Sequence, residues 1–210
     1  DSDNITYAYN WYKGGVLNAT SLITDSLISY YPLNNDTKDY YGSNDGNNGG
    51  AVQNKTSYAI GGAYTFDGTD DVINMSLTIT DYPITMSAWF KTTDVTGPIV
   101  GFADSSDGDV YFALAVITDG DLHFVARENG GLNDQYDTGI NVNNDKWHHI
   151  VGVYTSATDR NIYLDGNFVV QRTGEVIFGT KDMFGISSVP RSGSEPLGLL
   201  NGEIDEVQIW

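Results

Sequence analysis

The chain lacks cysteine altogether, so its 210 residues can form no disulfide and no thiolate zinc site. Basic residues are scarce: 10 Lys and Arg stand against 28 Asp and Glu, and the net charge of −18 argues against a nucleic-acid partner. No apolar run approaches the roughly 20 residues of a membrane-spanning helix. The chain starts at Asp1 without a leader, so a secretory signal would have to lie outside this sequence.

Glutamate is rare as well, since 23 of the 28 acidic residues are Asp. Aspartate favours turns, where its short side chain bonds nearby backbone, and it is a common calcium ligand. Solubility or adaptation to salt would explain the same bias. We expect Asp67 and Asp70–Asp71 to be turn residues rather than metal ligands.

The stretch from Trp147 to Gln171 indicates an antiparallel meander. Trp147–Tyr154 is rich in β-branched and aromatic residues and apolar on both alternating faces, as in a strand covered on both sides. Arg160–Leu164 predicts a second strand and Asn167–Gln171 a third, joined by Asp165-Gly166, a strong hairpin signal. Helical periodicity is absent from this stretch.

Similar short strands recur along the chain with turn signals between them, which is typical of an all-β sandwich. Two long loops are expected, Asn34–Gly50 and Glu128–Gly139. The remaining predicted strands are Leu27–Leu33, Tyr58–Asp67, Val72–Met75, Ile84–Thr92, Pro98–Phe102, Val110–Val116, Leu122–Ala126, Met183–Ser187 and Gly202–Trp210.

Five ordered blocks carry a family resemblance. The chain resembles the laminin-G-like, concanavalin A-like jelly-roll domains of extracellular proteins, over about Ser26–Trp210. The resemblance implies a β-sandwich of two antiparallel sheets. The blocks are Lys146-Trp147-His148-His149, Tyr163-Leu164-Asp165-Gly166, Phe66–Asp71, Thr85–Lys91 and Gly202–Trp210.

The resemblance implies a non-catalytic recognition or adhesion module, extracellular or on the cell surface, that binds a glycan or a partner surface. Two alternatives remain open: a structural spacer or filament subunit of a surface assembly, and a glycoside hydrolase of the laminarinase type. One fold hosts many functions, so the ligand does not follow from the family.

The hydrolase alternative depends on carboxylates along one strand face. Strand alternation places Glu203 and Asp205 on one face and Glu206 on the other. Retaining hydrolysis needs two carboxyl groups about 5 Å apart. Val207 and Gln208 occupy the positions where laminarinase-like enzymes carry their last Glu, so we expect no enzyme.

Metal binding through histidine is not expected, because His148 and His149 alternate to opposite strand faces. Related jelly rolls carry a structural calcium ion. By resemblance, its ligands here would be Asp205, the carbonyl of Gly62 and Asp39. Asp205 could instead cap a turn or pair with an arginine.

A glycan site needs aromatic and polar side chains that are free to reach a ligand. The residues in or beside the second long loop meet this need: Arg127, Asn129, Asn133 and Tyr136. An ordinary mobile loop is the alternative. Trp89 and Trp147 lie in strand blocks and are expected in the core.

Five N-x-Ser/Thr sequons lie within the first 76 residues, at Asn4, Asn18, Asn35, Asn54 and Asn74. If the protein is secreted, they would place glycans at one end of the domain.

Residues 1–25 precede the main family resemblance. Ile5–Tyr12 alternates aromatic and small residues and predicts a strand, with Lys13-Gly14-Gly15 as a turn. The segment resembles one strand and turn of a prokaryotic immunoglobulin-like repeat. We expect Tyr7, Tyr9 and Trp11 to pack against this domain, a preceding domain or the edge of a second copy, and the last option would produce self-association.

Overall fold

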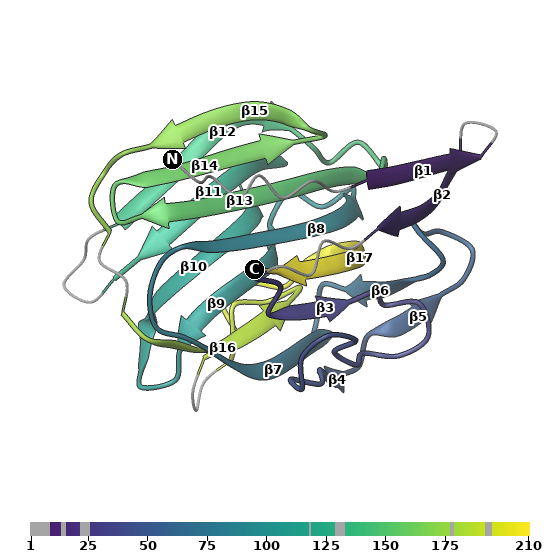
Figure 1. Ribbon diagram of the computed structural model, residues 1–210, viewed down its shortest axis with the longest axis horizontal. Helices are drawn as coiled ribbons and strands as arrows, with labels where there is room; N and C mark the ends of the chain where they lie inside the picture. Colours follow the sequence, from purple (N-terminus) through teal and green to yellow (C-terminus); the bar gives the residue numbers. More distant parts are fainter. Residues whose placement is uncertain are drawn as a thin grey trace.

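A computed structural model describes residues 9–13, 16–21, 26–117, 119–128, 133–176, 179–191 and 195–210. Every regular element in these ranges is a β-strand (Figure 1). The strands are β1 Tyr9–Lys13, β2 Val16–Ser21, β3 Ser29–Tyr31, β4 Asn47–Gly49, β5 Val52–Asn54, β6 Ala63–Asp67, β7 Val72–Ile79, β8 Ile84–Thr92, β9 Gly97–Asp104, β10 Asp107–Ile117, β11 Asp121–Arg127, β12 Asn133–Asn141, β13 His148–Ser156, β14 Asp159–Leu164, β15 Asn167–Arg172, β16 Lys181–Ile186 and β17 Asn201–Ile209.

The strands after β2 form two antiparallel sheets that lie one behind the other in Figure 1. The seven-stranded sheet has the order β12-β11-β10-β9-β16-β7-β4. The other sheet has the order β15-β14-β13-β8-β17-β6-β5, and β3 adds to β17. The predicted sandwich of two antiparallel sheets is therefore confirmed. β17 lies between β8 and β6, so the end of the chain closes the centre of its sheet.

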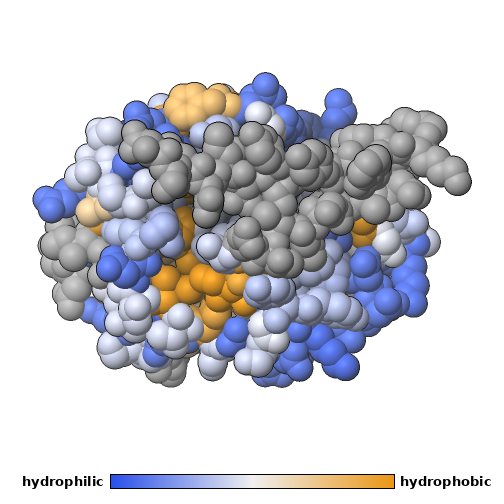
Figure 2. Space-filling model, in the orientation of Figure 1, coloured by the Kyte–Doolittle hydropathy of each residue, from blue (hydrophilic) through white to orange (hydrophobic). Residues whose placement is uncertain are grey.

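One core fills the space between the sheets because alternate residues of each strand point inward. In β8 these are Ile84, Met86, Ala88 and Phe90, all within one buried cluster. Full burial of one such large apolar side chain stabilises the fold by about 1.5–3 kcal/mol. In the same view, Figure 2 shows mostly hydrophilic surface, with one larger hydrophobic area near its middle.

The meander predicted from Trp147 to Gln171 is present as β13, β14 and β15. The turn between β14 and β15 has positive φ at both central residues, 51° at Asp165 and 77° at Gly166, as a type I′ turn requires. Side-chain contacts place the two histidines on opposite faces of β13. The His148 ring lies near Phe90 of the core and the His149 ring near Trp89. Trp89 is half-buried on the outer face, so the expectation that it belongs to the core was wrong.

A buried ion cluster joins the edges of the two sheets. Asp134 of β12 accepts hydrogen bonds from Arg160 of β14 at 2.6 Å and from Arg172 of β15. Arg160 is fully buried. Burial raises the pKa of Asp134, but the hydrogen bonds and charges of Arg172 and Arg160 outweigh it and hold that pKa below its ordinary value.

The prediction of a loop over Glu128–Gly139 was wrong for the part that the structure describes. β12 begins at Asn133 and pairs with β11 along its length. Its polar composition suits an edge strand with one face in water, and such a strand has no apolar alternation to reveal it. A smaller correction applies to Asn34–Gly50, whose last residues form β4.

The strand expected over Ile5–Tyr12 is present in its described part as β1. β1 pairs with β2 in a separate two-stranded sheet, from Tyr9 opposite Ser21 to Lys13 opposite Val16. Tyr7 lies outside the described residues. Self-association through this strand stays a prediction. No helix in the described ranges is long and apolar enough to cross a membrane.

Candidate functional site

The outer face of the seven-stranded sheet carries one row of residues that runs across six neighbouring strands. Backbone pairing sets this row, because each member lies directly opposite the next. The side chains become smaller toward the middle of the row and end in an amide on each side. The row, here called the cross-sheet row, is Gln135, Val125, Ala113, Gly101, Gly185 and Asn74.

A connecting segment between β16 and β17 lies over the middle of this row. We call residues 187–200 the strap; its residues 192–194 are outside the described ranges. The N–H of Ser187 bonds the carbonyl of Ile99 at 2.9 Å, and the N–H of Leu200 bonds the Ser187 hydroxyl at 3.2 Å. Leu197 N–H bonds the carbonyl of Val189 at 3.0 Å, so the two arms of the strap pair with each other.

Two glycines allow the strap to lie directly on the sheet. A Cβ atom at Gly101 would stand 2.9 Å from a methyl group of Val189. A Cβ atom at Gly185 would stand 2.7 Å from the carbonyl oxygen of Ser188 and 2.9 Å from Cδ of Pro190. Any larger side chain at these positions would therefore push the strap away.

The strap separates two hollows on this face of the sheet. The larger hollow has a volume of about 610 Å³ and the smaller one about 190 Å³. The larger hollow is lined by Asn44, Asp45, Asn47, Asn74, Ser76 and Arg191, with Met75, Met183, Pro190 and Pro196 as apolar surface. The smaller is lined by Tyr111, Ile117, Val125, Gln135, Val189 and Leu197 among others.

The larger hollow has the chemistry of a site for a small polar ligand. Sites for small organic ligands commonly measure roughly 300–1,000 Å³ and combine apolar walls with a few directed polar groups. Amide groups and a carboxylate supply donors and acceptors here, and Met and Pro side chains supply apolar surface. The hydroxyl of Ser188 donates to Asn74 Oδ1 at 3.0 Å, which fixes one of these amides.

Of the four residues predicted to bind a ligand, Arg127 and Tyr136 have described side chains, and these two do not converge. Tyr136 lies opposite Phe124, whose side chain is in the core, whereas the Arg127 side chain lies on the other face of the sheet. The backbone of Asn133 pairs opposite Arg127. Arg172 covers the Tyr136 ring at 4.4 Å. Asn129 lies outside the described residues. Neither Arg127 nor Tyr136 lines either hollow.

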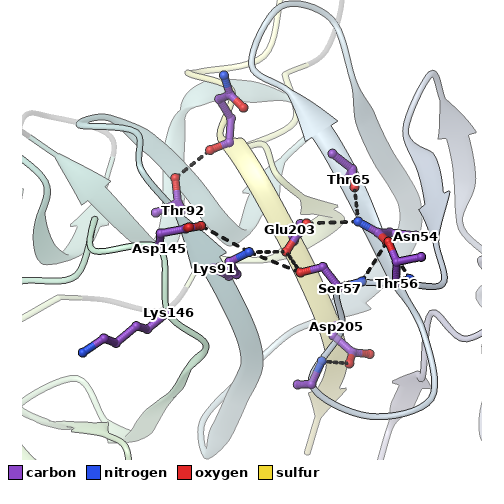
Figure 3. Close-up of polar contacts among 12 residues, drawn as sticks. Asn54, Thr56, Ser57, Thr65, Lys91, Thr92, Asp145, Lys146, Glu203 and Asp205 are labelled. Atoms are coloured by element: carbon purple, nitrogen blue, oxygen red, sulfur yellow. Dashed lines mark hydrogen bonds and ion pairs between the residues drawn. The ribbon is translucent and has the colours of Figure 1, made fainter.

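The carboxylate pair of β17 lies on the outer face of the other sheet (Figure 3). Glu203 Oε2 accepts the Ser57 hydroxyl at 2.5 Å and lies 3.4 Å from Lys91 Nζ. Asn54 Nδ2 donates to Glu203 Oε1 at 3.0 Å, and Lys91 also contacts Asp145 at 3.1 Å. Both oxygens of Glu203 are therefore held by protein groups.

Asp205 is fully buried on the same face. Its Oδ2 accepts the backbone N–H groups of Ala59 at 3.0 Å and Ile60 at 2.7 Å. Its Oδ1 has no hydrogen-bond partner among the described residues. Burial, with the nearby charge of Glu206, raises the pKa of Asp205 from 3.8 to about 8.

Strict alternation placed Glu206 on the core face, and this was wrong. Ile204 and Val207 both belong to the core although they are three residues apart, because the pairing of β17 with β8 shifts between Asp205 and Gln208. Glu206 has a φ of 51° and accepts the Tyr30 hydroxyl at 2.8 Å. Burial raises the pKa of Glu206 to about 7.

Calcium fits part of the predicted ligand set. Asn34 Oδ1, like Asp205 Oδ1, is buried without a partner among the described residues. Both side chains border residues 59–62: Asp205 bonds Ala59 and Ile60, and Asn34 lies against Gly61 and Gly62. Two buried oxygen atoms that lack hydrogen-bond partners and lie beside the same segment suit a cation that binds oxygen ligands.

Asp39 fits this set less well. Its Oδ1 accepts the N–H groups of Tyr30, Tyr41 and Gly42, and its Oδ2 accepts from Asn44. Asp39 therefore organises the loop after β3 with both oxygens. Asp67 and Asp71 take part in turn hydrogen bonds: Asp67 Oδ1 accepts from Thr69 N–H at 2.7 Å, and Asp71 Oδ2 accepts from Asp67 N–H at 3.0 Å. With Asp70 they also form a group of carboxylates close enough to hold a metal ion, so their role as turn residues rather than ligands stays a prediction.

The sequons differ in accessibility. Asn35 is exposed, whereas Asn54 is half-buried and bonded to Glu203. Asn74 is half-buried and accepts from Ser188. The side chain of Asn18 is not among those described, and Asn4 lies outside the described ranges.

Sequence reasoning missed the strap and the hollows. Each hollow is built from segments that lie far apart in the chain, and no periodic pattern marks them. The signals were two glycines inside strand patterns, Gly101 and Gly185, which often mark a close approach of another backbone.

A family model described as the concanavalin A-like lectin/glucanases superfamily matches residues 66–210. The predicted laminin-G-like, concanavalin A-like resemblance is thereby confirmed for this part. The model does not extend to residues 1–25, so the likeness to an immunoglobulin-like repeat stays a prediction. No match was found among curated proteins.

Solved structures share the fold at low sequence identity. Domain 4 of the extracellular arabinanase AbnA from Geobacillus stearothermophilus, solved with arabinotriose, has a TM-score of 0.68 and 20% identity, over 87% of this chain and 91% of that chain. A botulinum neurotoxin type C structure, described as depending on two ganglioside molecules for cell entry, has a TM-score of 0.67 and 14% identity. The match covers 90% of this chain and 48% of the toxin chain. Domains LG4-5 of mouse laminin α1 have a TM-score of 0.58 and 16% identity, over 77% of this chain and 44% of that one.

Proposed function

Because the chain belongs to the concanavalin A-like lectin/glucanase superfamily, we propose that it is a non-catalytic glycan-binding module of an extracellular or cell-surface protein. The larger hollow on the seven-stranded sheet carries this proposal. It brings side-chain amides, a carboxylate and a guanidinium together with apolar Met and Pro surface. A sugar presents hydroxyl groups and C–H faces, which match these two kinds of surface.

The named ligands of two structural neighbours support the same class of ligand. One neighbour was solved with arabinotriose, and another is described as interacting with gangliosides. At 20% identity or less, these likenesses concern the fold, so the sugar that this chain binds has to be identified by experiment.

The carboxylates of β17 support binding rather than hydrolysis. Glu203 is held by Lys91, Ser57 and Asn54. Asp205 holds the backbone of Ala59 and Ile60. A nucleophile or general acid needs access to the glycosidic bond. Both oxygens of Glu203 are held by protein groups, and Asp205 is fully buried.

A calcium ion is the second part of the proposal. Asp205, Asn34 and the carbonyl of Gly62 would supply oxygen ligands, and water would complete the six to eight that calcium takes. The ion would neutralise buried charge and fix the segment that leads into β6. Its role would be structural, because this segment belongs to the other sheet from the larger hollow.

A glycan array followed by calorimetry on the strongest ligand tests the proposal. Asn47→Ala removes an exposed amide from the larger hollow, and Gln135→Ala removes an exposed amide from the smaller one. One lost hydrogen bond is worth about 0.5–1.5 kcal/mol, so we expect Asn47→Ala to weaken binding about 2- to 12-fold. Gln135→Ala should leave binding unchanged.

Two results would contradict the proposal. Silence across the array, with self-association in solution, would favour a structural spacer. Binding that is lost in Gln135→Ala and kept in Asn47→Ala would place the ligand in the smaller hollow instead.

A further inference from the structure

We propose that this module recognises the ends of glycan chains or branches and excludes chain interiors, because the strap closes one side of the larger hollow. This inference rests on the proposed glycan-binding function and adds the part of the glycan that is bound. The observations that carry it are the cross-sheet row, the seating of the strap and the positions of the two hollows.

Without the strap, the cross-sheet row would form a continuous trough. It would run from Asn47, which lies opposite Asn74, to Gln135. Six strand spacings of about 4.8 Å give it a length of roughly 30 Å. Its middle holds only Gly185, Gly101 and Ala113. Such a trough could hold several consecutive units of a polysaccharide.

The strap interrupts this trough at its middle, where the side chains of the row are smallest. Val189 lies against Gly101, and Ser188 and Pro190 lie against Gly185. A single added Cβ atom at either glycine would already collide, so no sugar ring can pass between the strap and the sheet.

The strap is held too firmly for a ligand to displace it easily. Ser187 and Ser188 are fully buried and Val189 is 2% exposed. Hydrogen bonds tie Ser187 to β9 and Ser188 to β7, and the arms pair between Val189 and Leu197. Displacement would break these bonds and expose apolar surface together.

Neighbouring strap residues line opposite hollows. Val189 and Leu197 line the smaller hollow, while Pro190 and Pro196 line the larger one. The larger hollow therefore ends at a wall of two prolines and Arg191. A glycan that lies along the cross-sheet row in this hollow must therefore present a terminal unit to this wall.

Matched pairs of oligosaccharides on an array test the inference. Each pair presents one determinant as the terminal unit and the same determinant extended by one further residue; arabinotriose and sialyllactose are two of the probes. Where the terminal form binds, we expect extension at the end that meets the strap to weaken binding about tenfold or more, because the added residue would collide with the strap. Equal binding of the terminal and extended forms would overturn the inference while leaving the glycan-binding function intact. Silence for every pair would overturn both.

A pair of strap variants provides the second measurement. Pro190→Gly/Pro196→Gly removes wall side chains from the larger hollow, and Leu197→Ala changes the adjacent residue that lines the smaller one. We expect the double variant to reduce the discrimination against extended probes by about fivefold or more, and Leu197→Ala to keep it. Unchanged discrimination in a double variant with normal melting would count against the strap as the cause. If the double variant does not fold, the array result for the unmodified protein decides.

Discussion

The carboxylate of Asp205 accepts the backbone N–H of Ile60 at 2.7 Å, which ties the last strand to the segment that leads into β6. The same carboxylate is fully buried, and its second oxygen has no partner among the described residues. A group of this kind stabilises the loop through one oxygen, while its charge is costly to bury. Two predictions follow from this conflict.

The first concerns pH. Burial raises the pKa of Asp205 to about 8 and that of Glu206 to about 7. An acid whose pKa is raised by folding contributes stability below its unfolded pKa of about 4, and this stability is lost as pH rises through the folded value. In the presence of a chelator, we expect the melting temperature to be at least about 5 °C higher at pH 5 than at pH 8.5. Asp205→Asn keeps the acceptor without the titration, so it should reduce this difference; an unchanged difference would assign the effect to other groups.

The second concerns calcium. Calcium binds the ionised form of Asp205 and stabilises the folded state by mass action. Added calcium should therefore raise the melting temperature, and more at pH 8 than at pH 5, because the ion competes with a proton. Asp205→Ala should abolish the response, whereas Asp67→Ala, in an exposed acidic turn, should retain it. A response that is the same in both variants would contradict the assigned ligand.

The third concerns the ion cluster between the sheet edges. Asp134→Asn leaves the fully buried Arg160 without its carboxylate, and breaking a buried pair in this way costs about 3–5 kcal/mol. Asp137→Asn is the matched control on the same strand, because its side chain is 55% exposed and its pairing with His123 is weak. Urea unfolding measures both. A loss below about 1 kcal/mol in Asp134→Asn would mean that the arginines find other acceptors.

Individual strands show which parts of the fold could be predicted from the sequence. β8 was predicted with its observed bounds, Ile84–Thr92, because its apolar residues alternate toward one core. β12 was missed because its register depends on pairing with β11 and its inward charge on Arg160 and Arg172. Alternation also failed at Glu206, where a bulge makes two successive residues point outward.

The candidate site was less accessible to sequence reasoning than the fold. Its residues come from β4 and the loop before it, and from β7, β16 and the strap, which lie far apart in the chain. Residues chosen from one stretch, such as Arg127 and Tyr136, divide between the two faces of a sheet instead. Only tertiary pairing brings Asn74 level with Gly185 and Gly101.

The fourth prediction tests the hydrolase alternative. We expect no release of reducing ends from a β-glucan, because Glu203 and Asp205 are both engaged with the loop before β6. Glu203→Gln should leave glycan binding unchanged and lower stability by less than about 1 kcal/mol, as expected for a partly exposed ion pair with Lys91. Hydrolysis by the unmodified protein that is lost in Glu203→Gln would establish an enzyme.

The fifth concerns the sequons and connects them with the larger hollow. A glycan needs an asparagine whose amide is accessible, and Asn35 is exposed in the loop after β3. Asn54 is bonded to Glu203 and Thr65, and Asn74 lines the larger hollow and accepts from Ser188. In protein secreted from a glycosylating host, peptide mass spectrometry should find Asn35 occupied to a greater extent than either. A glycan on Asn74 would fill the hollow proposed for the ligand, so enzymatic deglycosylation should restore array binding to any protein that carries one. High occupancy of Asn74 together with full glycan binding would place the ligand elsewhere on the molecule.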